Sequence, residues 1–313
     1  MKVNNLSLSK FIELPDVKAR LRQEFVKPRF SEDKPMLAPV KTANTSKIGI
    51  AFDYLMRFYA KYLNLNAVSN QWVAEKALEI LNVIKDNDTV ETPPNSRLRK
   101  VSDIDESPKS FIEDWKKVKY KYHSQAKITI ETAKKNYKSY LKNGKMDDKL
   151  IASALDLATL DVLVTAGYVP PLKRSKPDKN DMEDLRQLIA IINPDTIKAE
   201  HTCVLNPSFG PEATKLMNAE GDIVIDDILI DIKTVNNLKV DRKIFNQLLG
   251  YYTLYRIGGI QGMPSSNQIN KLGIYFSRHG HLHTYKVEDL VNESSYLDFI
   301  EWFKERALAI KTD

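Results

Sequence analysis

The chain contains a single cysteine, Cys203, among its 313 residues. One cysteine excludes a disulfide framework, a cysteine-ligated zinc site and a four-cysteine iron–sulfur cluster held within this chain. Disulfide-free chains are typical of reducing compartments. We therefore expect a cytoplasmic location and no iron–sulfur cofactor.

Long apolar runs are also missing. The first twenty residues lack the continuous apolar core of a signal peptide. The longest apolar stretch, residues 151–169, is interrupted by Asp156 and Asp161, which would lie deep in a bilayer if the stretch crossed one. We therefore expect neither secretion nor a membrane partner.

Glycine-rich phosphate loops and dinucleotide-binding fingerprints do not occur in the sequence. Kinase, ATPase and Rossmann oxidoreductase functions are set aside for that reason. What the chain does have is 42% hydrophobic residues, enough for a core, and a formal charge of +6 from 47 basic and 41 acidic residues. That charge permits a polyanionic partner without requiring one.

The patterning divides the chain into three parts. Residues 1–46 are expected to form an extended segment, because 25–46 are rich in proline and lysine and have no apolar period. Residues 47–195 are predicted to be mainly helical. The predicted helices run from a Ser46 cap to about residue 63, from a Ser69 cap to 84, and over about 111–141, 147–165 and 181–192.

Residues 196–313 have a different character. Short β-branched and aromatic runs predict five strands. A helix over about 242–256, with Asp241 as its cap and Gly258–Gly259 as its stop, is predicted between the third and fourth of them. A last helix is predicted over about 294–310.

The segment from Gly221 to Thr234, GDIVIDDILIDIKT, predicts a β-hairpin with a two-residue turn at Asp226–Asp227. Side chains alternate along a strand, so every isoleucine of the segment falls on one dry face. These isoleucines are Ile223, Ile225, Ile228, Ile230 and Ile232. On the opposite face Asp222 and Asp231 stand across from one another, with Cβ atoms about 5 Å apart.

The paired carboxylates indicate a metal site. Two bare carboxylates repel, so the arrangement makes sense mainly if a cation lies between them. Oxygen ligands without nearby Cys or His favour Mg²⁺ or Mn²⁺. Lys233, on the same face, can orient an attacking water or offset charge on a phosphate. The alternative is a solvent-facing hairpin in which Asp231 and Lys233 form a surface pair.

Asp222, followed nine residues later by Asp231-x-Lys233, resembles the PD-(D/E)XK nuclease superfamily. Gln247-x-x-x-Tyr251 on the next helix is similar to the motif of its RecB-like branch, although amphipathic packing would produce the same spacing. The resemblance covers about residues 181–287. It implies an α+β fold with a restriction-endonuclease-like α-β-β-β-α-β core and a mixed sheet. Gly221 replaces the proline that often precedes the first acid.

Two further carboxylates are candidate metal ligands. Asp53, in Gly49-Ile-Ala-Phe-Asp53, resembles the G-x-x-x-H helix motif of the RecB-like branch with Asp in place of His; a solvated acid is the alternative. Asp184, with Glu183 beside it, lies on the helix before the first strand of the core. First-turn acids that complement a helix dipole would look the same.

His279, His281 and His283 form a tract that straddles an expected turn at His279–Gly280. A strand places only His281 and His283 on one face. With no further ligand nearby in the sequence, a structural hairpin is favoured over metal binding.

A lysine-rich helix over about 111–145 is the candidate nucleic-acid surface. Lys116, Lys117, Lys119 and Lys121 alternate there with aromatic residues. Interleaved cations and aromatic rings can follow a phosphate backbone and stack on bases. A long solvated helix has much the same composition, and both interpretations stay open.

The function indicated by these residues is Mg²⁺-dependent hydrolysis of phosphodiester bonds, with DNA as the expected substrate. Asp222 and Asp231 would hold the metal, Lys233 would position the water, and Gln247 with Tyr251 would orient the strand. Two alternatives are a non-catalytic nucleic-acid-binding module on a nuclease fold and a protein-interaction scaffold.

Overall fold

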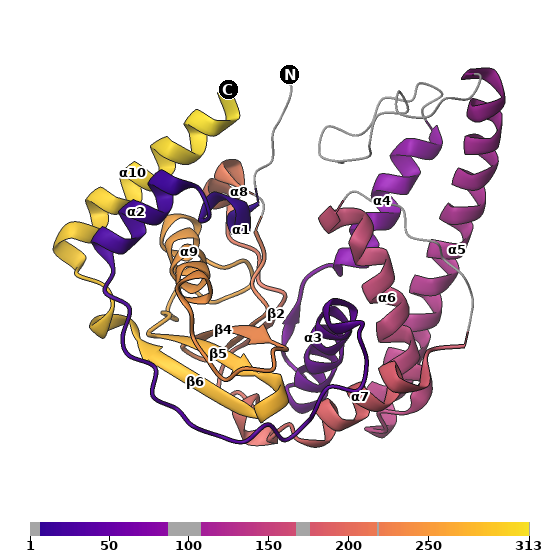
Figure 1. Cartoon of the computed structure of the whole chain (residues 1–313), viewed down its shortest axis with the longest axis horizontal. Coiled ribbons are helices and arrows are strands. Elements are labelled where there is room, and N and C mark those ends of the chain that lie inside the picture. Colours follow the sequence, from indigo (N-terminus) through magenta and orange to yellow (C-terminus); the bar gives the residue numbers. More distant parts are fainter. Residues whose placement is uncertain (1–6, 87–107, 167–175, 218, 313) are drawn as a thin grey trace.

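The fold is described from a computed structural model of the chain (Figure 1). It describes residues 7–86, 108–166, 176–217 and 219–312. Within these ranges, the side chains of residues 80–86, 108–121, 163–166 and 311–312 are not described.

The described strands form one mixed six-stranded sheet in the order β1-β2-β3-β4-β5-β6. The pairs β1–β2 and β4–β5 are parallel, and the other neighbours are antiparallel. The strands are β1 (Val68–Ser69), β2 (Cys203–Leu205), β3 (Ile223–Ile225), β4 (Ile228–Lys233), β5 (Lys271–Phe276) and β6 (His281–Lys286). The predicted α+β class is confirmed, and the five predicted strands are β2 to β6.

The described helices lie on both faces of the sheet (Figure 1). They are α1 (Leu8–Phe11), α2 (Pro15–Glu24), α3 (Thr45–Leu63), α4 (Val73–Asp86), α5 (Pro108–Asn143), α6 (Asp148–Ala166), α7 (Lys179–Ala190), α8 (Pro211–Leu216), α9 (Arg242–Gly258) and α10 (Glu293–Thr312). Among them, none combines the length and the apolar character that a membrane crossing requires.

Two hydrophobic cores sandwich the sheet. One packs α3 to α7 against the face that carries Ile223, Ile225, Ile230 and Ile232, so the predicted isoleucine face is confirmed. The other packs α1, α2, α8, α9 and α10 against the opposite face. Val224 and Leu229 are buried there. The face that holds Asp222 and Asp231 is therefore covered by helices rather than open to water.

The prediction that regular structure begins near residue 47 is wrong, because α1 and α2 lie within the segment that was expected to be extended. Their apolar residues recur at helical spacing, and Phe11 and Val17 have no exposed surface. Phe11 packs edge-on against Phe303 of α10, with ring centroids 4.8 Å apart. Helices this short are marginal on their own, and packing on the distant C-terminal helix stabilises them.

Of the predicted helix N-caps, Asp241 is confirmed, whereas Ser46 and Ser69 are wrong. Asp241 caps α9 by accepting a hydrogen bond from the Ile244 N–H at 2.8 Å, and Gly259 ends the helix with φ of 72°. Ser46 is not a cap, since α3 begins at Thr45. Ser69 is not a cap either: it pairs with Leu205 in the short strand β1, and α4 begins at Val73.

The segment between α2 and α3, residues 25–44, is called the strap below. It runs past the edge of the sheet (Figure 1) and is held by Arg278, which follows β5. The Leu37 and Ala38 N–H groups donate to the Arg278 carbonyl at 2.8 and 3.0 Å. The Arg278 guanidinium donates to the Ala38 carbonyl at 3.1 Å and to Asp184 of α7 at 2.7 Å. Arg278 therefore joins the strap, the sheet and α7.

Arg278→Met should lower the free energy of unfolding by about 3–5 kcal/mol, because it leaves the carboxylate of Asp184 buried without its cation. Both side chains of this pair have no exposed surface. Chemical denaturation with urea measures the change. The matched control is Arg186→Met, whose partners Asp148 and Glu183 are exposed, and it should cost about 0–1 kcal/mol. Equal losses in the two variants would contradict a structural role for the buried pair.

Candidate active site

The β3–β4 hairpin has the predicted register. Val224 pairs with Leu229 and Ile225 with Ile228, which leaves Asp226 and Asp227 as the turn. Asp226 adopts a left-handed conformation with φ of 50°. Its carboxylate accepts the N–H groups of Glu200, His201 and Thr202 at 2.8–2.9 Å. This anchored turn fixes the pairing of the two strands that carry the candidate ligands.

Asp222 lies one residue before β3, so the same register places it opposite Asp231 of β4. The Ile232 N–H donates to Asp222 Oδ2 at 2.7 Å, which ties the first acid to the strand of the second. The sequence-based pairing of these two residues is thus supported by the strand register and by the bond from the Asp222 side chain to the residue after Asp231.

A chain of contacts continues from β4 to α9. Lys233 Nζ lies 2.6 Å from Asp231 Oδ2 and donates to Gln247 Oε1 at 3.0 Å. Gln247 Nε2 in turn donates to the Tyr251 hydroxyl at 3.0 Å. Asp231, Lys233, Gln247 and Tyr251 are therefore one connected group on one face of the sheet. Because its amide nitrogen is bound to Tyr251, Gln247 presents its oxygen to Lys233.

Asp53 approaches the same group from α3, on the other side of the hairpin. Burial raises the pKa of Asp53 well above its usual range, and the nearby charge of Asp222 raises it further. The charges of Arg57 and Lys233 act in the opposite direction. Asp53 thus faces the hairpin acids rather than open solvent.

Gly49, one turn before Asp53, lies against the end of β4. A Cβ atom at Gly49 would stand 3.7 Å from Cβ of Thr234. This is ordinary van der Waals contact. The end of β4 therefore approaches α3 at Gly49, although not closely enough to require glycine there.

Burial dominates the electrostatics of the group. Asp231 is 2% exposed, and burial raises its pKa to about 6, with Lys233 lowering the pKa and Asp222 raising it. Burial lowers the pKa of Lys233, but the carboxylates of Asp231 and Asp222 outweigh burial and leave that pKa raised. Lys233 is therefore an ammonium ion at neutral pH and cannot act as a base there.

The donor set fits a hard divalent cation. Three carboxylates, those of Asp53, Asp222 and Asp231, lie around one ammonium, and the buried Asp231 Oδ2 is 2.6 Å from its nitrogen. Oxygen ligands alone suit Mg²⁺ or Mn²⁺. Among the described residues, Asp53, Asp222 and Asp231 do not form a group whose ligand atoms all lie within 4.8 Å of one another. The three carboxylates are therefore candidate oxygen ligands that do not together form one closed ligand set.

Asp184 has a different environment. Its two carboxylate oxygens accept from the Arg278 guanidinium at 2.7 and 3.2 Å, and the Lys41 N–H donates to it at 3.1 Å. This use of both oxygens argues against the predicted metal role. Glu183 is exposed and pairs with Arg186.

Lys116, Lys117, Lys119 and Lys121 belong to α5, but their side chains lie outside the described residues. In the described part of α5, Lys134, Lys135, Lys138 and Lys142 line one shallow hollow together with Glu131. These lysines fall within the lysine-rich stretch of about 111–145 that the sequence singled out, beyond the four residues named as candidate contacts.

Arg57 is a neighbour of the site that the sequence analysis missed. It lies one turn after Asp53 on α3, stacks over the Tyr54 ring at 4.8 Å and donates to Asn206 Oδ1 at 2.8 Å. The Asn206 N–H donates to the Asp222 carbonyl at 3.0 Å. The helical spacing of Asp53 and Arg57 is the signal that could have identified this pair.

Asp231→Asn should stabilise the fold at pH 8 by up to about 3 kcal/mol. The pKa of Asp231 is higher in the folded chain, about 6, than its ordinary value of 3.8. The folded chain therefore binds this proton more tightly, and the native protein loses stability as the pH rises from about 4 to 6. Urea denaturation at pH 4 and pH 8 measures the difference, which should be small at pH 4.

The exposed Asp298 provides the control. Asp298→Asn should leave the free energy of unfolding unchanged within about 0.5 kcal/mol at both pH values. If Asp231→Asn destabilised the protein at pH 8, the ionised carboxylate would be a stabilising group, and the account of its burial given above would be wrong.

Comparison of the chain with models of protein families, with curated proteins and with solved structures finds no match in any of the three.

Proposed function

We propose that the chain is a Mg²⁺-dependent nuclease of the PD-(D/E)XK type, acting on DNA. The observation that carries the proposal is the connected group of Asp222, Asp231, Lys233, Gln247 and Tyr251. Two opposed carboxylates, an ammonium and an amide–phenol pair meet there on one hairpin and one helix. A buried cluster of charged groups lowers the stability of a fold and is typical of a catalytic site.

The order of elements supports the same assignment. From α7 the chain runs through β2, β3, β4, α9 and β5, with β2 to β4 antiparallel and β5 parallel to β4. This order agrees with the α-β-β-β-α-β core of restriction-endonuclease-like proteins, apart from the short helix α8 between β2 and β3.

Each side chain has a role that follows from its surroundings. Asp222 and Asp231 would hold the Mg²⁺, which when bound supplies Lewis-acid stabilisation of the charge that develops on the phosphate. Lys233, an ammonium held by Gln247, would orient the attacking water and offset phosphate charge. Tyr251 positions Gln247, and burial keeps its phenol neutral by raising its pKa.

DNA is the proposed substrate because the chain carries a net charge of +6 and a long basic helix. Lys116, Lys117, Lys119 and Lys121 of α5 are proposed phosphate contacts. Salt-dependent affinity would follow from the counterions that such contacts release.

Asp222→Asn, Asp231→Asn and Lys233→Ala should each lower Mg²⁺-dependent cleavage of DNA by about 100-fold or more. Loss of a ligand or of the transition-state cation costs on the order of 3 kcal/mol in barrier. The assay measures digestion of linear, nicked, single-stranded and circular DNA with Mg²⁺, with Mn²⁺ and with EDTA.

Asp298→Asn is the matched control, since it removes an exposed carboxylate away from the hairpin and should keep full activity. Full cleavage by any of the three hairpin variants would refute the assignment. DNA binding without cleavage by the native chain would favour a binding module, and neither binding nor cleavage would favour a scaffold.

Asp53→Asn should raise the Mg²⁺ concentration that gives half-maximal cleavage while leaving the maximal rate within about tenfold of native. We expect this because the Asp53 carboxylate interacts with the charges of Asp222 and Asp231 and adds to the negative charge that attracts the cation. Titration of the cleavage rate with Mg²⁺ measures it. An unmoved metal dependence would assign Asp53 to packing alone.

A further inference from the structure

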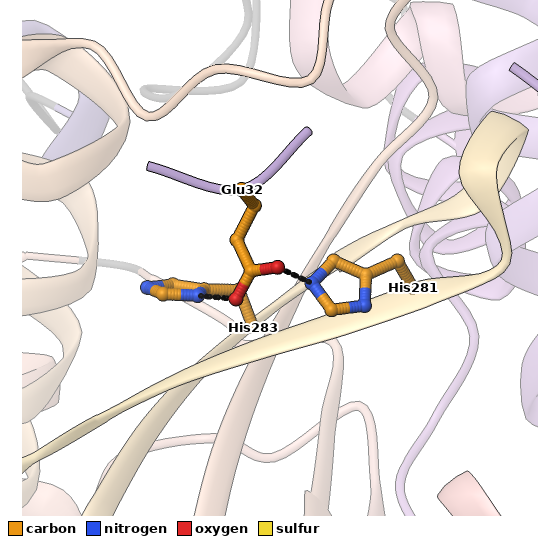
Figure 2. Close-up of side chains that lie close together, drawn as sticks. All are labelled: Glu32, His281 and His283. Carbon is orange, nitrogen blue, oxygen red and sulfur yellow. Dashed lines mark ion pairs between the residues drawn. The ribbon is translucent and has the colours of Figure 1, made fainter. Parts of the chain in front are cut away.

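A second cluster of metal-ligating side chains lies at the edge of the sheet, away from the hairpin carboxylates. It consists of Glu32 from the strap and His281 and His283 from β6, and one ligand atom of each lies within 4.8 Å of the others. Figure 2 shows the Glu32 carboxylate between the two imidazole rings, with one oxygen toward each ring. The sequence suggested the histidines but offered no third ligand, because Glu32 is about 250 residues away along the chain.

The spacing of these atoms is that of ligands rather than of hydrogen-bonded partners. His281 Nε2 lies 3.7 Å from Glu32 Oε2, and His283 Nδ1 lies 3.6 Å from Glu32 Oε1. Both separations exceed the length of a hydrogen bond. They are close to the distance of about 3.3–3.5 Å that separates two ligands bound to one tetrahedral zinc at about 2.0–2.1 Å each.

One ligand atom of the cluster lacks a hydrogen bond within the described chain. His281 Nε2, which lies toward Glu32, is buried without one. His283 presents Nδ1 to Glu32, and its ring is fixed between Phe30 and Tyr285, at centroid distances of 4.9 and 4.6 Å. A buried imidazole nitrogen without a hydrogen bond, such as His281 Nε2, is unfavourable unless a ligand completes it.

We propose that Glu32, His281 and His283 bind one Zn²⁺ ion, which fastens the strap to β6. Two imidazoles and one carboxylate are a donor set that suits zinc, whereas Mg²⁺ prefers oxygen ligands alone. Three protein ligands leave the fourth position of a tetrahedral ion for water. The site is separate from the hairpin carboxylates and does not depend on the proposed nuclease function.

The position of the cluster explains what the metal would do. Phe30 already packs on Phe276 of β5, and Arg278 holds Ala38 further along the strap. Glu32 lies between these two anchors. Zinc there would join the strap to the edge strand at a third point, and the binding free energy would add to the stability of the folded chain. Lys34 is a nearby positive charge that acts on His281 and would weaken, but not remove, the attraction for the cation.

The test is titration of the full chain, first stripped with EDTA, with Zn²⁺ alone, followed by calorimetry and by the melting temperature. We expect one Zn²⁺ bound per chain at this cluster and a rise in melting temperature with Zn²⁺ that Glu32→Gln removes, whereas the effect of Mg²⁺ on the melting temperature should be the same in the native chain and in Glu32→Gln. His281→Gln, His283→Gln and Glu32→Gln should each weaken Zn²⁺ binding by about tenfold or more. The Glu32 side chain is 36% exposed and lies on the strap, so its substitution tests the site even if a histidine variant fails to fold.

Two matched variants complete the design. His201→Gln removes an exposed histidine outside the cluster and should bind Zn²⁺ as the native chain does. Asp231→Asn should also keep Zn²⁺ binding, which separates this site from the hairpin site. Absence of stoichiometric binding, or native binding by the Glu32 and histidine variants, would overturn the proposal. Loss of binding in Asp231→Asn alone would overturn it as well, by assigning the zinc to the hairpin.

Discussion

The repulsion between carboxylates on a covered hairpin is the constraint that organises this protein. Asp222 and Asp231 face one another on a sheet whose two faces are both packed with helices, and Asp231 is 2% exposed. Burial and a like charge together oppose ionisation, and the single ammonium of Lys233 offsets only part of that cost. Ionised carboxylates in this arrangement destabilise the fold above about pH 6, so packing alone does not explain why two acids are placed there. Binding of a cation between the two acids would explain it.

The two helical layers contribute different groups to this site. From one side α9 supplies Gln247 and Tyr251, which hold the lysine through directed hydrogen bonds. From the other side α3 supplies Asp53, and Arg57 on the same helix lowers the pKa of Asp53. Charges on α3 and on the hairpin act on one another, since Asp222 and Lys233 shift the pKa of Asp53 and Asp53 raises that of Lys233. The two helical layers therefore bury the hairpin and also place charged and polar side chains around its acids.

The two candidate metal sites differ in chemistry and in how the chain assembles them. The hairpin site has oxygen donors from neighbouring strands and suits a hard cation for catalysis. The Glu32–His281–His283 cluster has nitrogen donors from one edge strand and an oxygen donor from the strap. It suits a structural zinc ion that links the strap to β6. The strap connects the helices on one face to those on the other. Anchoring it by Arg278, by Phe30 and by a metal would hold the two layers in place around the hairpin.

Features that depend on residues close together in the sequence could be predicted from sequence patterns. Alternation with a period of two and a two-residue aspartate turn predicted the pairing of Asp222 with Asp231, and a capping aspartate with a glycine stop predicted α9. Features that depend on contacts between residues far apart in the sequence became visible in the folded structure alone. The helices α1 and α2 are stabilised by packing against α10. The carboxylate of Asp184 binds the guanidinium of Arg278, which is 94 residues away in the sequence. Glu32 contacts His281, which is nearly the whole chain away. Contacts between residues so far apart leave no periodic pattern, since they arise from the packing of complete layers.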